Sequence, residues 1–293
     1  MQQVAIVGAA GKMGTWFASY FAQRGLEVSV YDTNQKKMLK TSSKVKVEES
    51  KVKVEESLSK CVQDADLVFI CVPVQKTPQV IKECTKNMKD RAIIAEISSV
   101  KNKTFAALKK IPNNIRPLCI HPMFGPGASK KVENRMLLVP VRNEKIEVKI
   151  ANEIFENANV IVLPNAKQHD KSIGIVLGLT YFANIVFARV MSSGNISMLK
   201  QVSGTTFGLQ SLIVESILTE EPDLVIALIG ENIYAKKYIN QYLKEAAALA
   251  RLAVANDSND LRAELQKIRL NMQKKQDIQQ SYNRMYEMID KHK

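Results

Sequence analysis

Cysteine, glycine and proline are all scarce in this chain of 293 residues. It contains 4 cysteines, 12 glycines and 9 prolines, too few for a disulfide-dense scaffold, a collagen-like repeat or a disordered glycine- and proline-rich chain. The cysteines show neither a CxxC pair nor zinc-ligand spacing, so we expect reduced thiols and no metal site. Hydrophobic residues make up 46% of the sequence, and the length predicts two domains or one large one.

The chain also lacks a long uninterrupted apolar segment. The longest apolar run, residues 173–190, contains Thr180, Asn184 and Arg189, and we interpret it as a buried helix rather than a membrane span. The amino terminus enters an apolar strand directly, without the basic segment and cleavage site of a secretory signal. We therefore expect a cytoplasmic protein that is not attached to a membrane.

Acidic residues are outnumbered by basic ones, and the excess is unevenly distributed. The 42 Lys and Arg residues and 29 Asp and Glu residues give a net charge of +13. Residues 1–165 hold 26 basic and 16 acidic side chains, whereas residues 166–293 hold 16 and 13. A positive field favours ligands that carry phosphates or carboxylates. We expect no nucleic-acid partner, because no binding motif or aromatic and basic strip accompanies the charge.

Short β-rich runs alternate with helical stretches in the first part of the chain. This alternation predicts an α/β fold, with a mainly parallel sheet covered by helices on both faces. After residue 166 the sequence reads as helix throughout. We therefore predict one domain over residues 1–165 and an all-helical domain over residues 166–293. The expected strands lie at residues 4–7, 28–31, 67–72, 92–97, 117–120, 136–141 and 160–164.

A perfect tandem repeat lies between the second and third of these strands. The sequence KVKVEES occupies residues 44–50 and again residues 51–57. Two copies of seven residues cannot build a repeat core, which needs several larger units. We interpret the repeat as an extended excursion and assign it no function.

A glycine-rich turn follows the first strand and precedes a helix. The sequence GAAGKMG at residues 8–14 is a GxxGxxG variant of the dinucleotide fingerprint, whose glycines let backbone amides approach a pyrophosphate. Asp32 ends the second strand, where a carboxylate accepts ribose hydroxyls and repels a 2′-phosphate. The first domain is thus predicted to be Rossmann-type and to prefer NAD over NADP. The expected cofactor contacts are Gly8, Gly11, Lys12, Met13, Gly14, Asp32, Val72 and Pro73.

Two further polar segments end predicted strands. EISSVK occupies residues 96–101 and IHPMFGP occupies residues 120–126. The carboxyl ends of parallel strands form the edge over which ligands bind in an open α/β sheet. Ser99, Lys101 and His121 can therefore converge on one ligand.

The segment HPMFGP at residues 121–126 resembles the signature around the catalytic histidine of the prephenate/arogenate dehydrogenase family. The likeness extends to SSVK at 98–101, the glycine turn, QHD at 168–170 and EPD at 221–223. The resemblance implies an NAD-dependent oxidative decarboxylation and a homodimer formed through the helical domain. The leading interpretation is conversion of prephenate, a dicarboxylate, to 4-hydroxyphenylpyruvate in tyrosine biosynthesis; arogenate as the substrate is the alternative.

The implied reaction needs a proton acceptor. A neutral imidazole, with an ordinary pKa of about 6.5, can take the proton of the substrate hydroxyl while hydride leaves the same carbon. We expect His121 to be this base. The resemblance implies that Ser99 bonds the same hydroxyl or His121, and that Lys101 steadies a substrate carboxylate or the active-site network. His169 is expected to be structural, as a helix cap and a tie between domains.

The sequence departs from the family where substrate carboxylates are held. Family members commonly use a histidine on the first long helix of the second domain and arginines on a later helix. Those positions fall on Tyr181 and near Gly208 and Ser216, none of which can make a bidentate ion pair. We expect Tyr181 and its neighbour Thr180 to contact the substrate through hydrogen bonds. Charge for the carboxylates can come from elsewhere in the chain, where the candidates are Lys101, Lys130, Lys131, Arg135 and Arg189.

The missing arginines leave other functions open. One is a family relative with an altered substrate, and another is an NAD-binding protein that has lost turnover. A hydroxyacid dehydrogenase of similar build needs a catalytic lysine on the first helix of the second domain, and Lys171 lies too early for that role.

Overall fold

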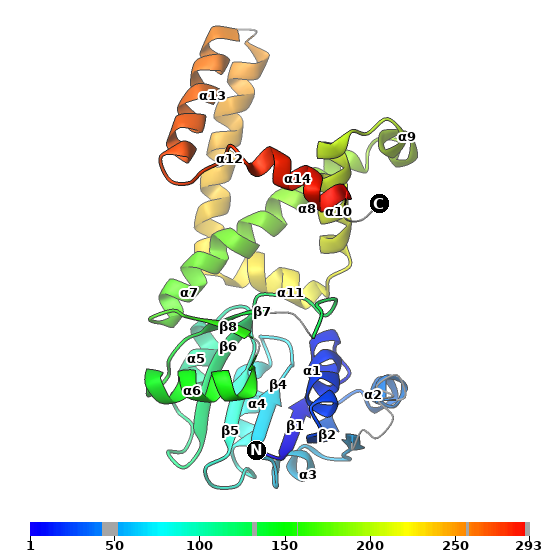
Figure 1. The fold of residues 1–293 in the computed structure, drawn as a ribbon, viewed down its shortest axis with the longest axis vertical. Coiled ribbons are helices and arrows are strands. Elements are labelled where there is room, and N and C mark those ends of the chain that lie inside the picture. Colours follow the sequence, from blue (N-terminus) through cyan, green and yellow to red (C-terminus); the bar gives the residue numbers. More distant parts are fainter. Residues whose placement is uncertain (43–51, 131–133, 157, 256–257, 291–293) are drawn as a thin grey trace. The chain divides into compact units, whose positions relative to one another are not determined.

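A computed structural model describes residues 1–42, 52–130, 134–156, 158–255 and 258–290 (Figure 1). The chain divides into two compact units. The first comprises Met1–Gly178 and Glu221–Ala235, and the second comprises Leu179–Glu220 and Lys236–Lys293. Helix α7 (Ala166–Ile173) belongs to the first unit by its contacts. The domain boundary after residue 165 stays a prediction.

An eight-stranded sheet forms the centre of the first unit, in the order β3-β2-β1-β4-β5-β6-β7-β8. Neighbouring strands from β3 to β6 are parallel, β7 is antiparallel to β6, and β8 is parallel to β7. The predicted α/β class with a mainly parallel sheet is confirmed. The strands are β1 (Gln3–Val7), β2 (Glu27–Tyr31), β3 (Val52–Val54), β4 (Leu67–Ile70), β5 (Ile93–Glu96), β6 (Arg116–Pro122), β7 (Asn134–Leu138) and β8 (Ala158–Val162).

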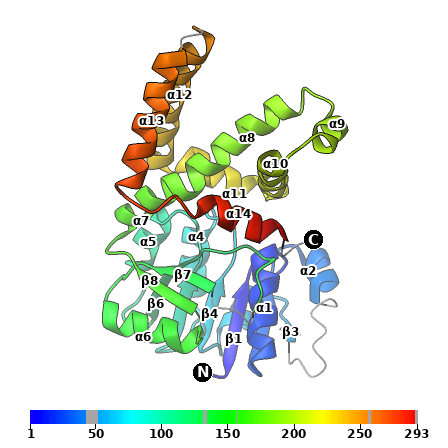
Figure 2. The same cartoon turned by 45° about the horizontal axis from the view of Figure 1, so that its top comes forward.

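Helices cover both faces of this sheet because successive strand side chains point to opposite faces. Val4 and Ile6 of β1 pack in one core with α1 (Lys12–Gln23) and α6 (Glu144–Ile154). Ala5 and Val7 pack in a second core with the helices of the other face, which are α3 (Leu58–Val62), α4 (Thr77–Cys84) and α5 (Asn102–Leu108) (Figure 2). All four residues of β4 are buried, as expected for a strand covered on both faces.

The second copy of the repeat contributes β3, a strand that the sequence interpretation does not include. Val52 and Val54 pair in parallel register with Val28 and Val30 of β2. Glu55 follows, and the Ser57 side chain accepts a hydrogen bond from the Lys60 amide at the start of α3. The first copy, residues 44–50, lies outside the described residues.

The remaining described elements are helical, which confirms the prediction for the later part of the chain. In the first unit they are α2 (Gln35–Ser42), α11 (Pro222–Ile226) and the π-helices η1 (Gly174–Leu179) and η2 (Ala227–Glu231), of which η1 ends one residue into the second unit. In the second unit they are α8 (Thr180–Met191), α9 (Ile196–Gln201), α10 (Thr205–Leu218), α13 (Ser258–Gln273), α14 (Ser281–Asp290) and nearly all of α12 (Ile233–Val254).

The second unit leaves much apolar surface uncovered. Among its described residues, one small buried cluster consists of Ala188 and Met191 of α8 and Val214 of α10. On the same two helices Val190 is 68% exposed and Leu212 is 63% exposed. A surface of this kind on a single chain indicates a contact with another molecule.

The apolar run predicted to be a buried helix is mostly not buried within one chain. Among the described residues, the helical run Ala166–Met191 is long and apolar enough to cross a membrane by length and composition, with a mean hydropathy of 1.8 over 18 residues. Only 28% of that window is buried. The expected absence of membrane attachment stays a prediction.

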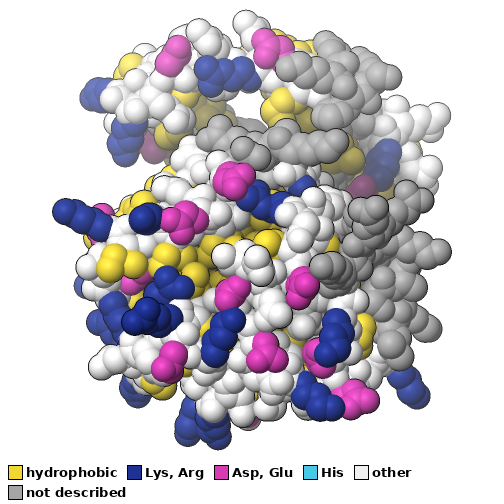
Figure 3. Space-filling model, turned by 60° about the horizontal axis from the view of Figure 1, so that its bottom comes forward, with side chains coloured by type: hydrophobic (Ala, Val, Ile, Leu, Met, Phe, Trp, Pro, Cys, Tyr) yellow, Lys and Arg dark blue, Asp and Glu magenta, His cyan; other side chains and the backbone are white. Residues whose placement is uncertain are grey.

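The surface charge on one face of the molecule is mixed. Figure 3 shows Lys and Arg side chains interspersed with Asp and Glu, rather than gathered into one basic patch, on the face that it draws. The expectation that nucleic acid is not a partner stays a prediction.

The four cysteines are free thiols. Cys61, Cys84 and Cys119 are buried in the core between the sheet and helices α3 to α5. Burial, together with the neighbouring Glu83 carboxylate, raises the pKa of the Cys84 thiol to about 12. These thiols are therefore protonated at neutral pH and chemically inert.

Candidate active site

The glycine turn connects β1 to α1 in a conformation that demands glycine. Gly8 has a φ of +88°, in the left-handed region where a side chain is strained. A Cβ on Gly14 would lie 2.2 Å from the carbonyl oxygen of Gly8, so Gly14 lets the helix start pack directly on the turn. Gly11 caps α1 without a side-chain hydrogen bond, and no acidic side chain lies in the first turn of this described helix. The start of α1 is therefore suited to an anionic group.

Asp32 joins the end of β2 to the glycine turn. One carboxylate oxygen accepts a hydrogen bond of 3.0 Å from the Ala10 amide, and the other accepts one of 2.8 Å from the Asn34 amide. Because each carboxylate oxygen has two acceptor sites, the group keeps capacity for two hydroxyl donors. The placement agrees with a ribose-binding role, which stays a prediction.

The other expected cofactor residues border the same turn. Val72 follows β4, and its Cγ1 atom would lie 2.9 Å from a Cβ on Gly8. Pro73 and Lys12 are exposed, while Met13 is half-buried and packs against the core on the α1 face of the sheet. The donor and acceptor set of this cradle fits a dinucleotide.

Lys101 lies in a buried ion pair and not on a surface open to ligands. Its side chain and that of Glu96 are both 0% exposed, and Nζ lies 2.6 Å from Oε1 of Glu96. The same ammonium donates to the carbonyl oxygen of Ile120, the residue before His121. Lys101 therefore ties the end of β5 to the end of β6. Of the two roles expected of Lys101, this buried position favours steadying the active-site network, and a contact with a substrate carboxylate stays a prediction.

His121 lies near the end of β6 and is 3% exposed. Its backbone pairs with Leu137 of β7. Burial holds the pKa of the His121 imidazole well below its usual value, and the neighbouring His169 ring and Lys101 ammonium lower it further because they disfavour a positive charge beside them. The ring is therefore neutral at physiological pH, as a proton acceptor must be.

His169 is a hydrogen-bonding partner of His121, which the sequence did not predict. Its Nε2 atom lies 3.0 Å from Nδ1 of His121, and its Nδ1 atom lies 2.9 Å from Oδ1 of Asp170. The expectation that His169 caps a helix is wrong, because Asn165 caps α7 by accepting a hydrogen bond from the Gln168 amide. The HD pair at 169–170 is the sequence signal that could have indicated a functional histidine. Its contact with His121 could not be predicted, because 48 positions separate the two residues.

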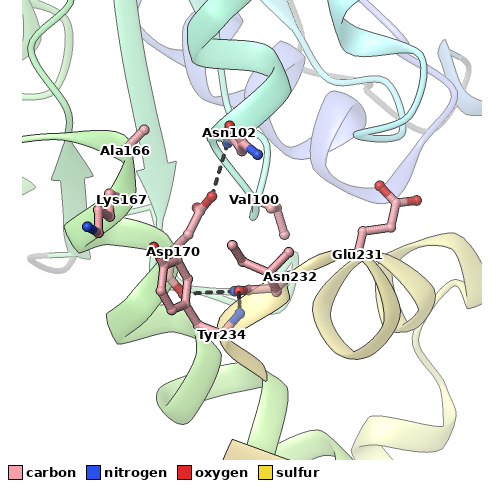
Figure 4. A pocket seen from close by; sticks show the side chains of 9 residues that line it. Val100, Asn102, Ala166, Lys167, Asp170, Glu231, Asn232 and Tyr234 are labelled. Atoms are coloured by element: carbon pink, nitrogen blue, oxygen red, sulfur yellow. Dashed lines mark hydrogen bonds between the residues drawn. The ribbon is translucent and has the colours of Figure 1, made fainter. Parts of the chain in front are cut away.

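Asp170 is anchored by neighbouring backbone and side-chain groups. Its Oδ1 atom accepts a hydrogen bond of 2.7 Å from the Lys101 amide, and its Oδ2 atom accepts one of 3.0 Å from the Asn102 amide. The Asn232 side chain donates to the Asp170 carbonyl at 2.9 Å (Figure 4). Asp170 and Asn232 also line a cavity of about 170 Å³ in the first unit, with Lys167 and Glu231 among its other walls (Figure 4).

Three predicted residues remain, which are Ser99, Thr180 and Tyr181. Ser99 is half-buried and, among the described residues, donates no hydrogen bond to His121. Its neighbour Ser98 is buried and donates to the hydroxyl of Thr77 at 3.1 Å. Thr180 and Tyr181 belong to the second unit. Burial and the Glu220 carboxylate raise the pKa of the Tyr181 hydroxyl, which is therefore a hydrogen-bond donor at neutral pH.

A doubly wound sheet with a glycine turn and an acidic residue after β2 is the arrangement of a dinucleotide-binding domain. The family models agree. Residues 17–163 match "Prephenate dehydrogenase, nucleotide-binding domain", and residues 165–267 match "Prephenate dehydrogenase, dimerization domain". This chain belongs to the prephenate dehydrogenase family.

Individual relatives are distant. A "Probable arogenate/prephenate dehydrogenase" of Methanocaldococcus jannaschii is 24% identical over 262 residues, which cover 87% of this chain and 57% of the relative. Among solved structures, a prephenate dehydrogenase from A. aeolicus in complex with hydroxyphenyl propionate and NAD+ has a TM-score of 0.73 at 20% identity, with 94% of this chain and 98% of that one covered. A Synechocystis arogenate dehydrogenase has a TM-score of 0.65 at 16% identity, with 93% and 99% covered.

Proposed function

We propose that this chain is an NAD-dependent dehydrogenase that converts prephenate to 4-hydroxyphenylpyruvate, with arogenate as the alternative substrate. The main support for this proposal is the environment of His121. Its imidazole is buried and neutral, lies at the carboxyl end of β6 and has a hydrogen-bonding partner on one side of the ring. The family supports the reaction class. We assign residues 1–165 to dinucleotide binding and residues 166–293 to substrate binding and dimerisation.

NAD is the proposed cofactor, and it supplies the hydride acceptor when bound. Gly8, Gly11 and Gly14 shape the turn, and the amides of Lys12 and Met13 begin α1, where a pyrophosphate is favoured. Asp32 accepts from the ribose hydroxyls and disfavours NADP. Val72 and Pro73 border the turn after β4. The relative solved with NAD+ supports this assignment.

In the proposed reaction, the protein itself carries out one proton transfer. His121 accepts the proton of the substrate C4 hydroxyl through Nε2 while the C4–H bond gives up hydride. The bond between C1 and its carboxylate then breaks, its electron pair enters the ring, and carbon dioxide leaves. The ring is now aromatic, and the proton on His121 returns to the phenolate oxygen. Ser99 is the proposed second hydrogen-bond partner of the substrate hydroxyl.

Lys101 serves this reaction by positioning the base. Its ammonium holds the Ile120 carbonyl and the Glu96 carboxylate, so it fixes the strand end that carries His121. Thr180 and Tyr181 are the residues proposed to bind the substrate side chain, through hydroxyls that form hydrogen bonds without charge.

The proposed partner is a second copy of the chain, supported by the exposed apolar residues of α8 and α10 and by the match to a dimerization domain. We place the enzyme in the cytoplasm.

Initial rates of NADH formation test the proposal, with prephenate and arogenate offered separately and NAD compared with NADP. We expect NAD to be reduced with prephenate and carbon dioxide to be released in equal amount. Faster reduction with arogenate would select the alternative substrate, and faster reduction of NADP would overturn the assigned role of Asp32.

A second candidate function is cofactor binding without turnover. It is favoured by the sequence at Tyr181 and near Gly208 and Ser216, because the family resemblance leads us to expect a histidine at the first position and arginines near the other two. It predicts a measurable NAD dissociation constant by calorimetry together with no NADH formation from either substrate.

A further inference from the structure

We infer that His169 and Asp170 fix the tautomer of His121, so that the lone pair of the base is held on Nε2 and its proton on Nδ1. This inference rests on the proposed function, because it assigns an orienting role to residues that do not themselves touch the substrate. His169 is thus a positioning residue of the candidate active site.

The geometry forms a chain of three buried side chains. Asp170 Oδ1 lies 2.9 Å from His169 Nδ1, and His169 Nε2 lies 3.0 Å from His121 Nδ1. His169 is fully buried, and Asp170 and His121 are each 3% exposed. Water therefore does not compete for the contacts that join them.

The direction of the hydrogen bonds follows from Asp170. An ionised carboxylate only accepts hydrogen bonds, and this one already accepts from the Lys101 and Asn102 amides. His169 must therefore place its proton on Nδ1, since the other tautomer would turn a nitrogen lone pair toward a carboxylate oxygen at 2.9 Å. The Nε2 atom of a neutral His169 is then an acceptor.

The same reasoning assigns the position of the proton on His121. With an acceptor 3.0 Å from its Nδ1 atom, His121 is stabilised with the proton on Nδ1. Its Nε2 atom is left unprotonated and is the one ring position that can receive a proton. Burial lowers the pKa of both imidazoles, which agrees with two neutral rings joined by one shared hydrogen bond.

Asp170, at the end of this series of hydrogen bonds, is held in place by groups other than the two histidines. The Asn232 side chain donates to the Asp170 carbonyl and accepts from the Tyr234 amide at the start of α12 (Figure 4). Asp170 is thus held through both its carboxylate and its backbone. A side chain with so little freedom can set the orientation of the next group in the chain.

Nitrogen NMR of histidine-labelled protein reads the tautomer directly. The chain has 3 histidines, so selective 15N labelling gives three imidazole spin systems, and H292Q and H169Q assign them. In the wild type we expect His121 to be protonated on Nδ1 and unprotonated on Nε2. Protonation of His121 on Nε2 in the wild type would overturn the inference.

Two substitutions of His169 separate tautomer control from simple packing. H169L fills the site without an acceptor, whereas the amide oxygen of H169Q can replace Nε2. We expect H169L to shift His121 toward the Nε2–H form and to lower kcat by ~100-fold, with the NAD dissociation constant unchanged. H169Q should restore most of kcat and the wild-type tautomer. Equal losses of kcat in the two variants would contradict tautomer control.

Failure of the proposed function gives a different result. The wild type could reduce no NAD with prephenate or arogenate while His121 still carries its proton on Nδ1. That result would contradict the proposed reaction and support the inferred tautomer of His121. If H169L does not fold, the wild-type spectrum together with H169Q still decides, because neither depends on that variant.

Discussion

The indole N–H of Trp16 donates a hydrogen bond of 2.9 Å to the carbonyl oxygen of Ala128. The donor lies on α1, directly after the glycine turn, and the acceptor lies in the segment that follows HPMFGP. The Trp16 ring also packs against Phe124, with centroids 4.9 Å apart. One side chain therefore joins the cofactor part of the candidate site to the segment that begins at His121.

Replacing Trp16 with Phe tests this link. The substitution keeps an aromatic ring but removes the donor, and we expect a loss of about 1 kcal/mol in the free energy of unfolding, measured with urea. Tyr20→Phe is the comparison on the same helix, because its hydroxyl donates to Ile154 at 3.3 Å and accepts from Arg24 at 3.0 Å, away from the HPMFGP segment. A Trp16 variant with the wild-type free energy of unfolding would contradict the proposed link.

Removing the buried ammonium of Lys101 should be costly. Lys101→Met leaves the Glu96 carboxylate buried without its cation, which typically destabilises a protein by about 3 to 5 kcal/mol. The double variant Lys101→Met, Glu96→Gln should recover part of that loss, because no unpaired charge remains. Urea unfolding of the three proteins checks this. A Lys101→Met variant of wild-type stability with only a raised KM would restore a substrate-contact role.

The close approach at the glycine turn makes Gly14 sensitive to substitution. In Gly14→Ala the new Cβ would meet the Gly8 carbonyl oxygen at 2.2 Å, so the turn must open. We expect the NAD dissociation constant to rise by at least ~10-fold, about 1.4 kcal/mol, in calorimetric titrations. Gly208→Ala in α10 is the control, since nothing lies within 4 Å of its added Cβ. Equal NAD affinity in both variants would show that the turn does not bind the cofactor.

Stability should fall in mild acid because of the two buried histidines. Burial lowers the pKa of His121 and His169 below 6.5 in the folded state, with Lys101 adding to the shift and Asp170 and Glu96 opposing it at His169. Below about pH 6.5 the unfolded chain therefore binds more protons than the folded one, and the free energy of unfolding decreases with falling pH.

Urea unfolding at a series of pH values measures this effect. We expect a plateau above about pH 7 and a decline below about pH 6.5. His169→Gln should reduce the slope, because one titrating group is lost. A free energy of unfolding that stays constant or increases on acidification through this range would contradict the assignment of neutral imidazoles.

Deleting residues 44–50 should leave the fold intact. The remaining copy of KVKVEES still supplies β3 and the Ser57 cap of α3, so we expect the free energy of unfolding to change by less than about 0.5 kcal/mol. The control is Val54→Ser, which weakens the packing of β3 against the core on the α1 face. Thermal unfolding of both proteins makes the comparison, and a deletion more damaging than Val54→Ser would show that the first copy has a structural role.

Local patterns predict much of the sheet and little of its connectivity. The apolar runs of β1 and β4, the glycine turn and Asp32 are all readable because each depends on neighbours in sequence. The reversal of β7 and β8 is not readable, since an apolar run has no direction. Strand β3 is missed because the tandem repeat is interpreted as an excursion, although the alternation of Lys and Val in KVKV is typical of a half-buried strand.

The candidate site shows the same limit. His121 is found through its motif, whereas its contact with His169 depends on how α7 lies against the end of β6. The charge of Lys101 suggests a ligand contact, because lysine is almost never fully buried, and only the partner Glu96 explains its position. The sequence therefore does not predict which side chains form pairs when they are far apart along the chain.

The rate of NADH formation by His121→Asn, compared with the wild type at saturating NAD and prephenate, tests the central claim most directly. Asparagine keeps a polar group of similar size but cannot accept the proton. We predict that turnover falls by ~100-fold or more while the NAD dissociation constant stays within about twofold, well under the 1.4 kcal/mol that a tenfold change represents. Unchanged turnover in the variant would remove His121 from the mechanism and contradict the account.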